Sequence, residues 1–170
     1  MPAHAQQQQE KTAAATREGL VQALNEDLSR EYQAIIAYVV YSQIMKGAEY
    51  MSIAAELEQH AHEELAHAIT ISKQIDYLGG LPTVSPKPVK TSEDPREMLQ
   101  FDLDNETETV RNYQARVRQC EELGEYAMTE EIRRILVQEQ EHQIDLAAAL
   151  GIEVPNMSRG RDGGDSGRAR

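Results

Sequence analysis

Two short motifs in this chain pair a glutamate with a histidine at the spacing of a metal site. Glu64 and Glu139 each open a Glu-x-x-His element, and these elements end at His67 and His142. A three-residue step puts both side chains of an element on one face of a helix, where a carboxylate oxygen and an imidazole nitrogen can bind the same ion. The chemistry that these residues support is therefore metal binding.

Each motif has a partner glutamate 33 residues earlier in the chain. Glu31 precedes Glu64 by this distance, and Glu106 precedes Glu139 by the same distance. Both pairs are centred on a glycine-containing stretch that is expected to be a turn between helices. Because residues equidistant from the turn of an antiparallel hairpin lie level, the two glutamates of each pair are expected to face each other.

Four long helices must position these side chains. Glycine and proline clusters divide the chain into helices expected at about 13–46, 49–78, 95–122 and 125–150. Short links make the first two and the last two antiparallel hairpins, whereas some fifteen proline-rich residues between the hairpins are enough to cross a bundle. The expected fold class is all-α, a four-helix bundle with one long crossover.

One glutamate interrupts the apolar stripe of every predicted helix. Burying four unpaired carboxylates would cost several kcal/mol each or force them to take up protons. Two divalent cations would neutralise the four carboxylates if both imidazoles are neutral. Oxygen-rich ligation with one nitrogen per ion favours iron or manganese over a closed thiolate zinc site.

The composition agrees with a helical protein and excludes other classes. The 170 residues include one Phe and no Trp, so the core must be aliphatic with some tyrosine, which favours helices over a β-sandwich or barrel. No apolar run is long enough to span a membrane and no leader is visible, so a cytoplasmic protein without membrane contact is expected. A single cysteine, Cys120, excludes a disulfide framework.

Three regions follow from these patterns, and the charge bears on partners. We expect a flexible N-terminus over residues 1–12, the bundle over 13–150 and a disordered glycine-rich tail over 151–170. The formal net charge of -12 repels duplex DNA, so DNA binding is not expected, although the tail itself is slightly basic.

The motifs together resemble the di-iron carboxylate site of the ferritin-like superfamily, and of bacterioferritins in particular. The residues that carry the resemblance are Glu31, Glu64-Leu65-Ala66-His67, Glu106 and Glu139-Gln140-Glu141-His142. The resemblance covers roughly residues 15–150 and implies a ferritin-like four-helix bundle that binds two iron ions per chain, with manganese as an alternative.

The resemblance also implies a role for each residue. Glu64 and Glu139 would bridge the two irons. Glu31 with His67 would complete one iron, and Glu106 with His142 would complete the other. Tyr38 corresponds to a tyrosine beside the family's metal centre and is the candidate catalytic residue.

Two departures from bacterioferritins shape the expected assembly. The haem-ligating methionine that follows the first bridging glutamate in bacterioferritins is replaced here by Leu65, so haem is not expected. The fifth helix of the 24-subunit cages has no counterpart after Gly151. This combination is similar to the Dps-like mini-ferritins and implies a homo-oligomeric shell of twelve subunits.

The function that the resemblance implies is that of a ferroxidase, which oxidises Fe(II) with O2 or H2O2 for iron storage and protection from oxidative stress. One alternative keeps the two metals but makes the protein a rubrerythrin-like peroxidase or a manganese catalase without storage. A second alternative is a purely structural helical protein with salt-bridged glutamates.

Four further residues have less specific interpretations. His60, one turn before Glu64, is either an accessory metal ligand or an ordinary surface histidine; the surface position is favoured, as it is for His62. Tyr113 is interpreted as a core tyrosine whose hydroxyl bonds a carboxylate, and Cys120 as a small buried apolar residue.

Overall fold

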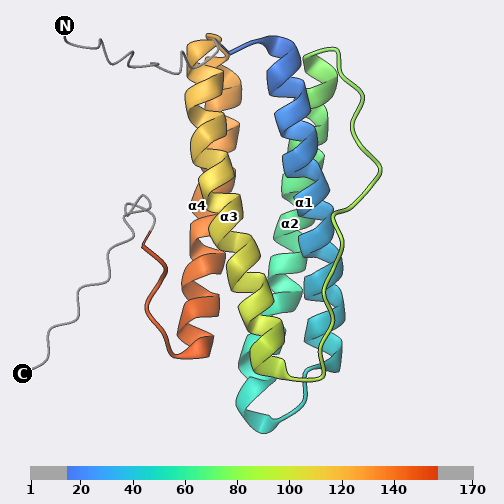
Figure 1. The fold of residues 1–170 in the computed structure, drawn as a ribbon, viewed down its shortest axis with the longest axis vertical. Coiled ribbons are helices and arrows are strands. Elements are labelled where there is room, and N and C mark those ends of the chain that lie inside the picture. The colour runs from blue at the N-terminus through green and yellow to red at the C-terminus, as the bar shows by residue number, and fades with distance from the viewer. Residues whose placement is uncertain (1–14, 157–170) are drawn as a thin grey trace, which may run out of the picture.

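The computed structural model describes residues 15–156, and four long helices dominate this part of the chain (Figure 1). The helices are α1 (Arg17–Ile44), α2 (Met51–Tyr77), α3 (Pro95–Glu122) and α4 (Tyr126–Leu150). A short 3-10 turn, η1 (Ala48–Tyr50), precedes α2, and the described residues contain no strand. The predicted all-α bundle is confirmed.

The helix boundaries follow the predicted ranges closely, except at the N-terminal end of α1. The first helix was expected from residue 13, but α1 begins at Arg17 because Thr16 is extended and its hydroxyl accepts a hydrogen bond from the Gly19 N–H at 3.0 Å. Asp94 caps α3 in the same way, by accepting from the Arg96 N–H at 2.9 Å. The predicted flexible N-terminus and most of the predicted tail lie outside the described residues.

The crossover between the hairpins runs along α1 (Figure 1). Residues 78–94 lead from the end of α2 to the start of α3. The side chain of Ser29 donates to the Ser85 carbonyl at 2.6 Å, and the Ser29 carbonyl accepts from the Lys87 N–H at 2.9 Å. Gln33, one turn further along α1, donates to the Pro88 carbonyl at 2.6 Å. These bonds hold an irregular segment against a helix and satisfy its backbone groups.

The apolar core is divided into two clusters, one near each end of the bundle. One cluster is built around Leu20, Leu24, Leu28, Ile71, Ile75, Tyr113 and Ile132. The other is built around Tyr38, Tyr41, Leu57, Leu99, Leu103 and Leu146. Burying one such aliphatic side chain contributes roughly 1.5–3 kcal/mol, so both ends hold the helices firmly together. The level between the clusters is occupied by charged side chains.

No helix in the described part of the chain combines the length and the apolar character that crossing a membrane requires.

Candidate metal centre

All six predicted metal ligands lie at the level between the two core clusters. Each of them is at most 2% exposed. The six residues are Glu31, Glu64, His67, Glu106, Glu139 and His142. One comes from α1, two from α2, one from α3 and two from α4. The structure therefore brings together every residue that the motif spacing selected.

These residues form two overlapping groups that share Glu64 and Glu139. The first group adds Glu31 and His67, and the second adds Glu106 and His142. Within each group the candidate ligand atoms all lie within 4.8 Å of one another. The two shared glutamates stand between two possible ion positions, as a pair of bridging carboxylates would.

The first half-site is defined by Glu31, His67, Gln138 and Tyr113. The Nδ1 atom of His67 lies 3.4 Å from Glu31 Oε2 and 3.2 Å from an oxygen of each shared glutamate. The other ring nitrogen, Nε2, lies 2.9 Å from the amide oxygen of Gln138. The Tyr113 hydroxyl donates to Glu31. An amide behind the imidazole thus fixes the ring with Nδ1 directed at the carboxylates.

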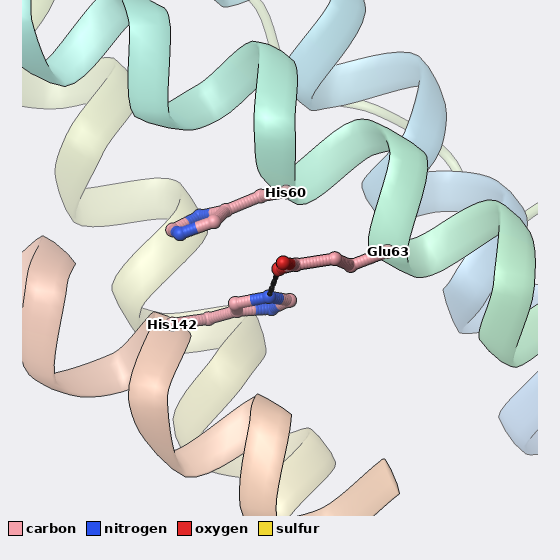
Figure 2. Close-up of side chains that lie close together, drawn as sticks. All are labelled: His60, Glu63 and His142. Atoms are coloured by element: carbon pink, nitrogen blue, oxygen red, sulfur yellow. Dashed lines mark hydrogen bonds and ion pairs between the residues drawn. The ribbon is translucent and has the colours of Figure 1, made fainter.

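The second half-site is defined by Glu106, His142, Glu63 and Tyr38. The Nδ1 atom of His142 lies 2.9 Å from Glu64 Oε1 and 3.9 Å from Glu106 Oε1. Its Nε2 atom lies 2.7 Å from a carboxylate oxygen of Glu63, the contact drawn as a dashed line in Figure 2. The Tyr38 hydroxyl donates to Glu106. The second imidazole is therefore fixed by a carboxylate.

The two half-sites are related by a constant offset of 75 residues. Adding 75 to a first-hairpin position gives its counterpart, and the pairs include Glu31 and Glu106, Tyr38 and Tyr113, and His67 and His142. Glu63 and Gln138 are counterparts as well, although the sequence argument did not select them. Each directly precedes a shared glutamate, and the offset was the signal that could have found them.

Several inward-facing atoms of the centre make no well-oriented hydrogen bond within the described residues, although most of them lie within ion-pair distance of a histidine or glutamate. They are Glu31 Oε2, Glu64 Oε1, Glu106 Oε2, both carboxylate oxygens of Glu139, and His142 Nδ1. Leaving buried polar atoms unpaired is costly. The donor set consists of carboxylate oxygens and imidazole nitrogens, which iron and manganese accept. The residues present therefore fit a pair of divalent cations.

The pKa values of the buried carboxylates are shifted in opposite directions, upwards by burial and neighbouring charges and downwards by bonds to the histidines. Burial, and then the charges of Glu139 and Glu64, raise the pKa of Glu31 well above its ordinary value, and burial and the same two charges raise that of Glu106. Burial works against the charge of Glu64 too, yet bonds to His142 and other neighbours hold its pKa below the ordinary range.

Both histidines gain basicity from the carboxylates around them. Burial opposes a charge on His142, but hydrogen bonds to Glu139 and Glu64 outweigh it and raise the pKa to about 12. His67 is shifted in the same direction by Glu139, Glu31 and Glu64, which outweigh the opposing effect of its burial. The centre therefore holds protons when no cation is bound, and a cation must displace them.

Both tyrosines of the centre are buried hydrogen-bond donors. Burial, and then the charge of the nearby glutamate, raises the pKa of Tyr38 and of Tyr113 well above the ordinary value, so both hydroxyls keep their protons. The interpretation of Tyr113 as a core tyrosine bonded to a carboxylate is confirmed. Tyr38 makes the equivalent bond, and its predicted catalytic role stays a prediction.

The favoured interpretation of His60 as a surface residue is wrong. His60 is 2% exposed because it points from α2 towards α4, where its ring stacks on that of His142 at 4.0 Å between centroids (Figure 2). Burial is the main cause that lowers its pKa. His62 is exposed and Cys120 is buried, as predicted.

Comparison with known proteins places this geometry in a family. Residues 21–153 match the family described as Ferritin-like domain. The chain is 25% identical over 141 residues to a bacterioferritin of Brucella melitensis biotype 1, an alignment that covers 79% of this chain and 88% of the relative. It is 28% identical over 139 residues to a bacterioferritin of Rhodobacter capsulatus, which covers 78% and 86%.

Two solved structures share the fold. A ferritin-like, diiron-carboxylate protein of Bacillus anthracis str. Ames superposes with a TM-score of 0.76 at 32% identity, over 79% of this chain and 96% of the other. A dodecameric thioferritin, the bacterioferritin-related protein of Bacteroides fragilis, superposes with a TM-score of 0.75 at 28% identity, over 81% and 88%.

Proposed function

The chain belongs to the ferritin-like domain family, and from this premise we propose that it is a di-iron ferroxidase that stores iron. It oxidises Fe(II) with O2 or H2O2 and retains the Fe(III) in a hollow homo-oligomeric shell. The reaction removes Fe(II), and with H2O2 as the oxidant it removes both reagents of hydroxyl-radical chemistry and so protects against oxidative stress.

The observation that carries this proposal is the pair of overlapping groups that share Glu64 and Glu139. Four buried carboxylates at one level match the charge of two divalent cations. In this proposal Glu64 and Glu139 would each contribute to both ions. Glu31 and His67 would hold one ion, and Glu106 and His142 would hold the other.

The ligand set also favours the chemistry. Negative oxygen ligands stabilise Fe(III) over Fe(II), so they favour loss of an electron from each iron. Two Fe(II) ions supply the two electrons that, with two protons, reduce one O2 to H2O2 or one H2O2 to two waters. The hydroxyls of Tyr113 and Tyr38 donate to Glu31 and Glu106, so we assign both tyrosines as positioning residues for these carboxylates.

Two observations support a shell as the site of storage. The Bacteroides fragilis relative is dodecameric, and this chain covers 88% of it. Several large apolar side chains on α1 and α2 are exposed in the single chain, among them Val39, Leu65 and Ile69. Exposed apolar patches mark interaction surfaces, and in a homo-oligomeric shell the neighbouring subunits would cover them. We propose a shell of twelve subunits without haem.

The direct test is aerobic titration of Fe(II) into metal-free protein. Fast oxidation should saturate near two irons per chain, and Glu64→Ala should abolish the fast phase. Glu141→Ala is the matched control, because it removes an exposed glutamate next to His142 and leaves the six ligands intact. Unchanged oxidation in Glu64→Ala would reject the assignment.

Particle size and retained iron separate the proposal from its alternatives. A hollow shell that keeps hundreds of irons supports storage. A small oligomer that turns over peroxide without accumulating iron would instead support the peroxidase or manganese catalase. Purified protein that binds no metal and shows no thermal shift with Fe(II) would support a structural role.

A further inference from the structure

A second group of possible ligands lies beside the paired centre, where α2 meets α4. Its members are Glu56 and His60 of α2 and Asp145 of α4, whose candidate ligand atoms all lie within 4.8 Å of one another. None of the three is among the six residues of the paired centre. The group combines one imidazole with two carboxylates.

The environment of His60 is the evidence that this group binds a ligand. It is 2% exposed, and its Nδ1 atom is buried without a hydrogen-bond partner. Its Nε2 atom lies only within a long 3.4 Å contact of Asp145 Oδ2. A buried imidazole with one unpaired nitrogen and one weak contact lacks the partners that buried polar groups usually have.

The internal repeat shows that packing does not require a histidine at this position. The residue 75 positions after His60 is Ile135, which is buried in the apolar core of the other end. The counterpart of Asp145 is Thr70, which bonds the Ala66 carbonyl of its own helix. The first half-site thus has an aliphatic side chain and a hydroxyl where the second has an imidazole and a carboxylate.

The position of the group connects solvent with the second half-site. The side chain of Asp145 is 46% exposed and Glu56 is exposed, so a hydrated cation can reach both. On the inner side, the ring of His60 stacks on the ring of His142. A carboxylate oxygen of Glu63 contacts the Nε2 atom of the His142 ring (Figure 2). The atoms of His60, Glu63 and His142 also lie within 4.8 Å of one another.

We propose that Glu56, His60 and Asp145 form a third divalent-cation site, distinct from the paired centre and open to solvent. Its nitrogen and carboxylate ligands suit Fe(II), Mn(II), Co(II) or Zn(II), and its remaining positions are taken by water. A cation bound here lies next to Glu63 and His142, so the site serves as a station on the path between solvent and the second half-site.

The test counts Co(II) bound to the full-length metal-free protein by equilibrium dialysis, with excess Mg(II) to suppress weak binding to surface carboxylates. Wild type should bind three ions per chain. His60→Ile, which introduces the residue that the repeat carries at position 135, should bind two. His62→Ala removes an exposed histidine two residues away and should still bind three.

A second variant guards against a folding defect in the first. Asp145→Asn changes a half-exposed side chain and should weaken the third ion about tenfold or more while both variants keep the helical circular dichroism of wild type. Three ions in His60→Ile, or two in wild type that His60→Ile leaves unchanged, would overturn the proposal. A single ion in wild type that His60→Ile removes would support the third site and count against the paired centre.

Discussion

The two half-sites have equivalent ligands, but a different residue contacts the Nε2 atom of the histidine in each. In the first, Gln138 presents a neutral amide oxygen to His67. In the second, Glu63 presents a carboxylate oxygen to His142. A carboxylate behind a ligating imidazole makes the ligand more basic and raises its affinity for a metal. Equivalent ligands at the two half-sites therefore do not give two equal metal positions.

The surroundings of the second half-site also favour cation binding more than those of the first. Glu63 is partly exposed, and the group formed by Glu56, His60 and Asp145 lies beside it. The equivalent surroundings of the first half-site contain Ile135 and Thr70. We therefore expect the second half-site to fill first and to bind its ion more tightly. Four experiments test this difference between the half-sites and the organisation of the centre.

Removing a shared ligand should have the largest effect, because it breaks both halves at once. Glu139→Ala should lose both ions and lower the rate of Fe(II) oxidation about 100-fold or more, whereas Glu106→Ala should lose only the second ion. Metal counting by dialysis and single-turnover oxidation would measure both. Retention of two tight ions in Glu139→Ala would show that this carboxylate is not shared.

The protein without metal should lose stability as the pH rises, because the native centre holds protons that the unfolded chain releases. The pKa of His142 is raised to about 12 and that of His67 is raised as well, so their contribution is present below 6.5 and is lost above it. Glu31 and Glu106, with raised pKa values, act in the same direction above 4.5. The pKa of His60 is lowered from 6.5, so this group does not contribute to the loss of stability above 6.5.

Thermal unfolding from about pH 7 to about pH 9 measures this effect. The Tm of the metal-free protein should fall across the window, and saturating Co(II) should flatten the profile because cations replace the protons. A metal-free Tm that is constant or rises with pH would contradict the assigned protonation of the centre.

Exchanging the two residues behind the histidines tests the comparison directly. Glu63→Gln gives the second half-site the amide of the first and should weaken its ion about tenfold. Gln138→Glu is the reciprocal change and should strengthen the first ion by a similar factor. Competition titrations with Co(II) would resolve both constants. Equal effects of the two changes on the same ion would show that the half-sites are not independent.

The frame of the centre could be predicted from the sequence, because symmetry about two turns brings Glu31 to Glu64 and Glu106 to Glu139 whatever the details of packing. The position of His60 could not. The sequence favoured a surface position for His60, and only the packing of α4 against α2 shows that this side chain is buried.

The residues that hold the ligands were harder to predict than the ligands. Glu63 and Gln138 lie one position outside the apolar stripes, where a polar side chain is ordinary. Their role depends on the neighbouring helix, since each contacts a histidine of a different helix. The start of α1 was missed for a simpler reason: the Thr16 cap is a single hydrogen bond, to the Gly19 N–H, and apolar periodicity does not report it.

Removing one tyrosine hydroxyl should have the smallest effect and should be alike in both halves. Tyr38→Phe and Tyr113→Phe each delete one hydrogen bond to a buried carboxylate, which costs about 1 kcal/mol and lowers the Tm of a chain of this size by roughly 2–4 °C. Because the two hydroxyls occupy equivalent positions of the repeat, equal losses in the metal-free protein are the expected result. Because phenylalanine keeps the ring that lies 5.4 Å from the His60 ring, a larger loss for Tyr38→Phe would show that the hydrogen bond to Glu106 is the stronger of the two. No loss in either variant would show that Glu31 and Glu106 keep their positions without these hydroxyls.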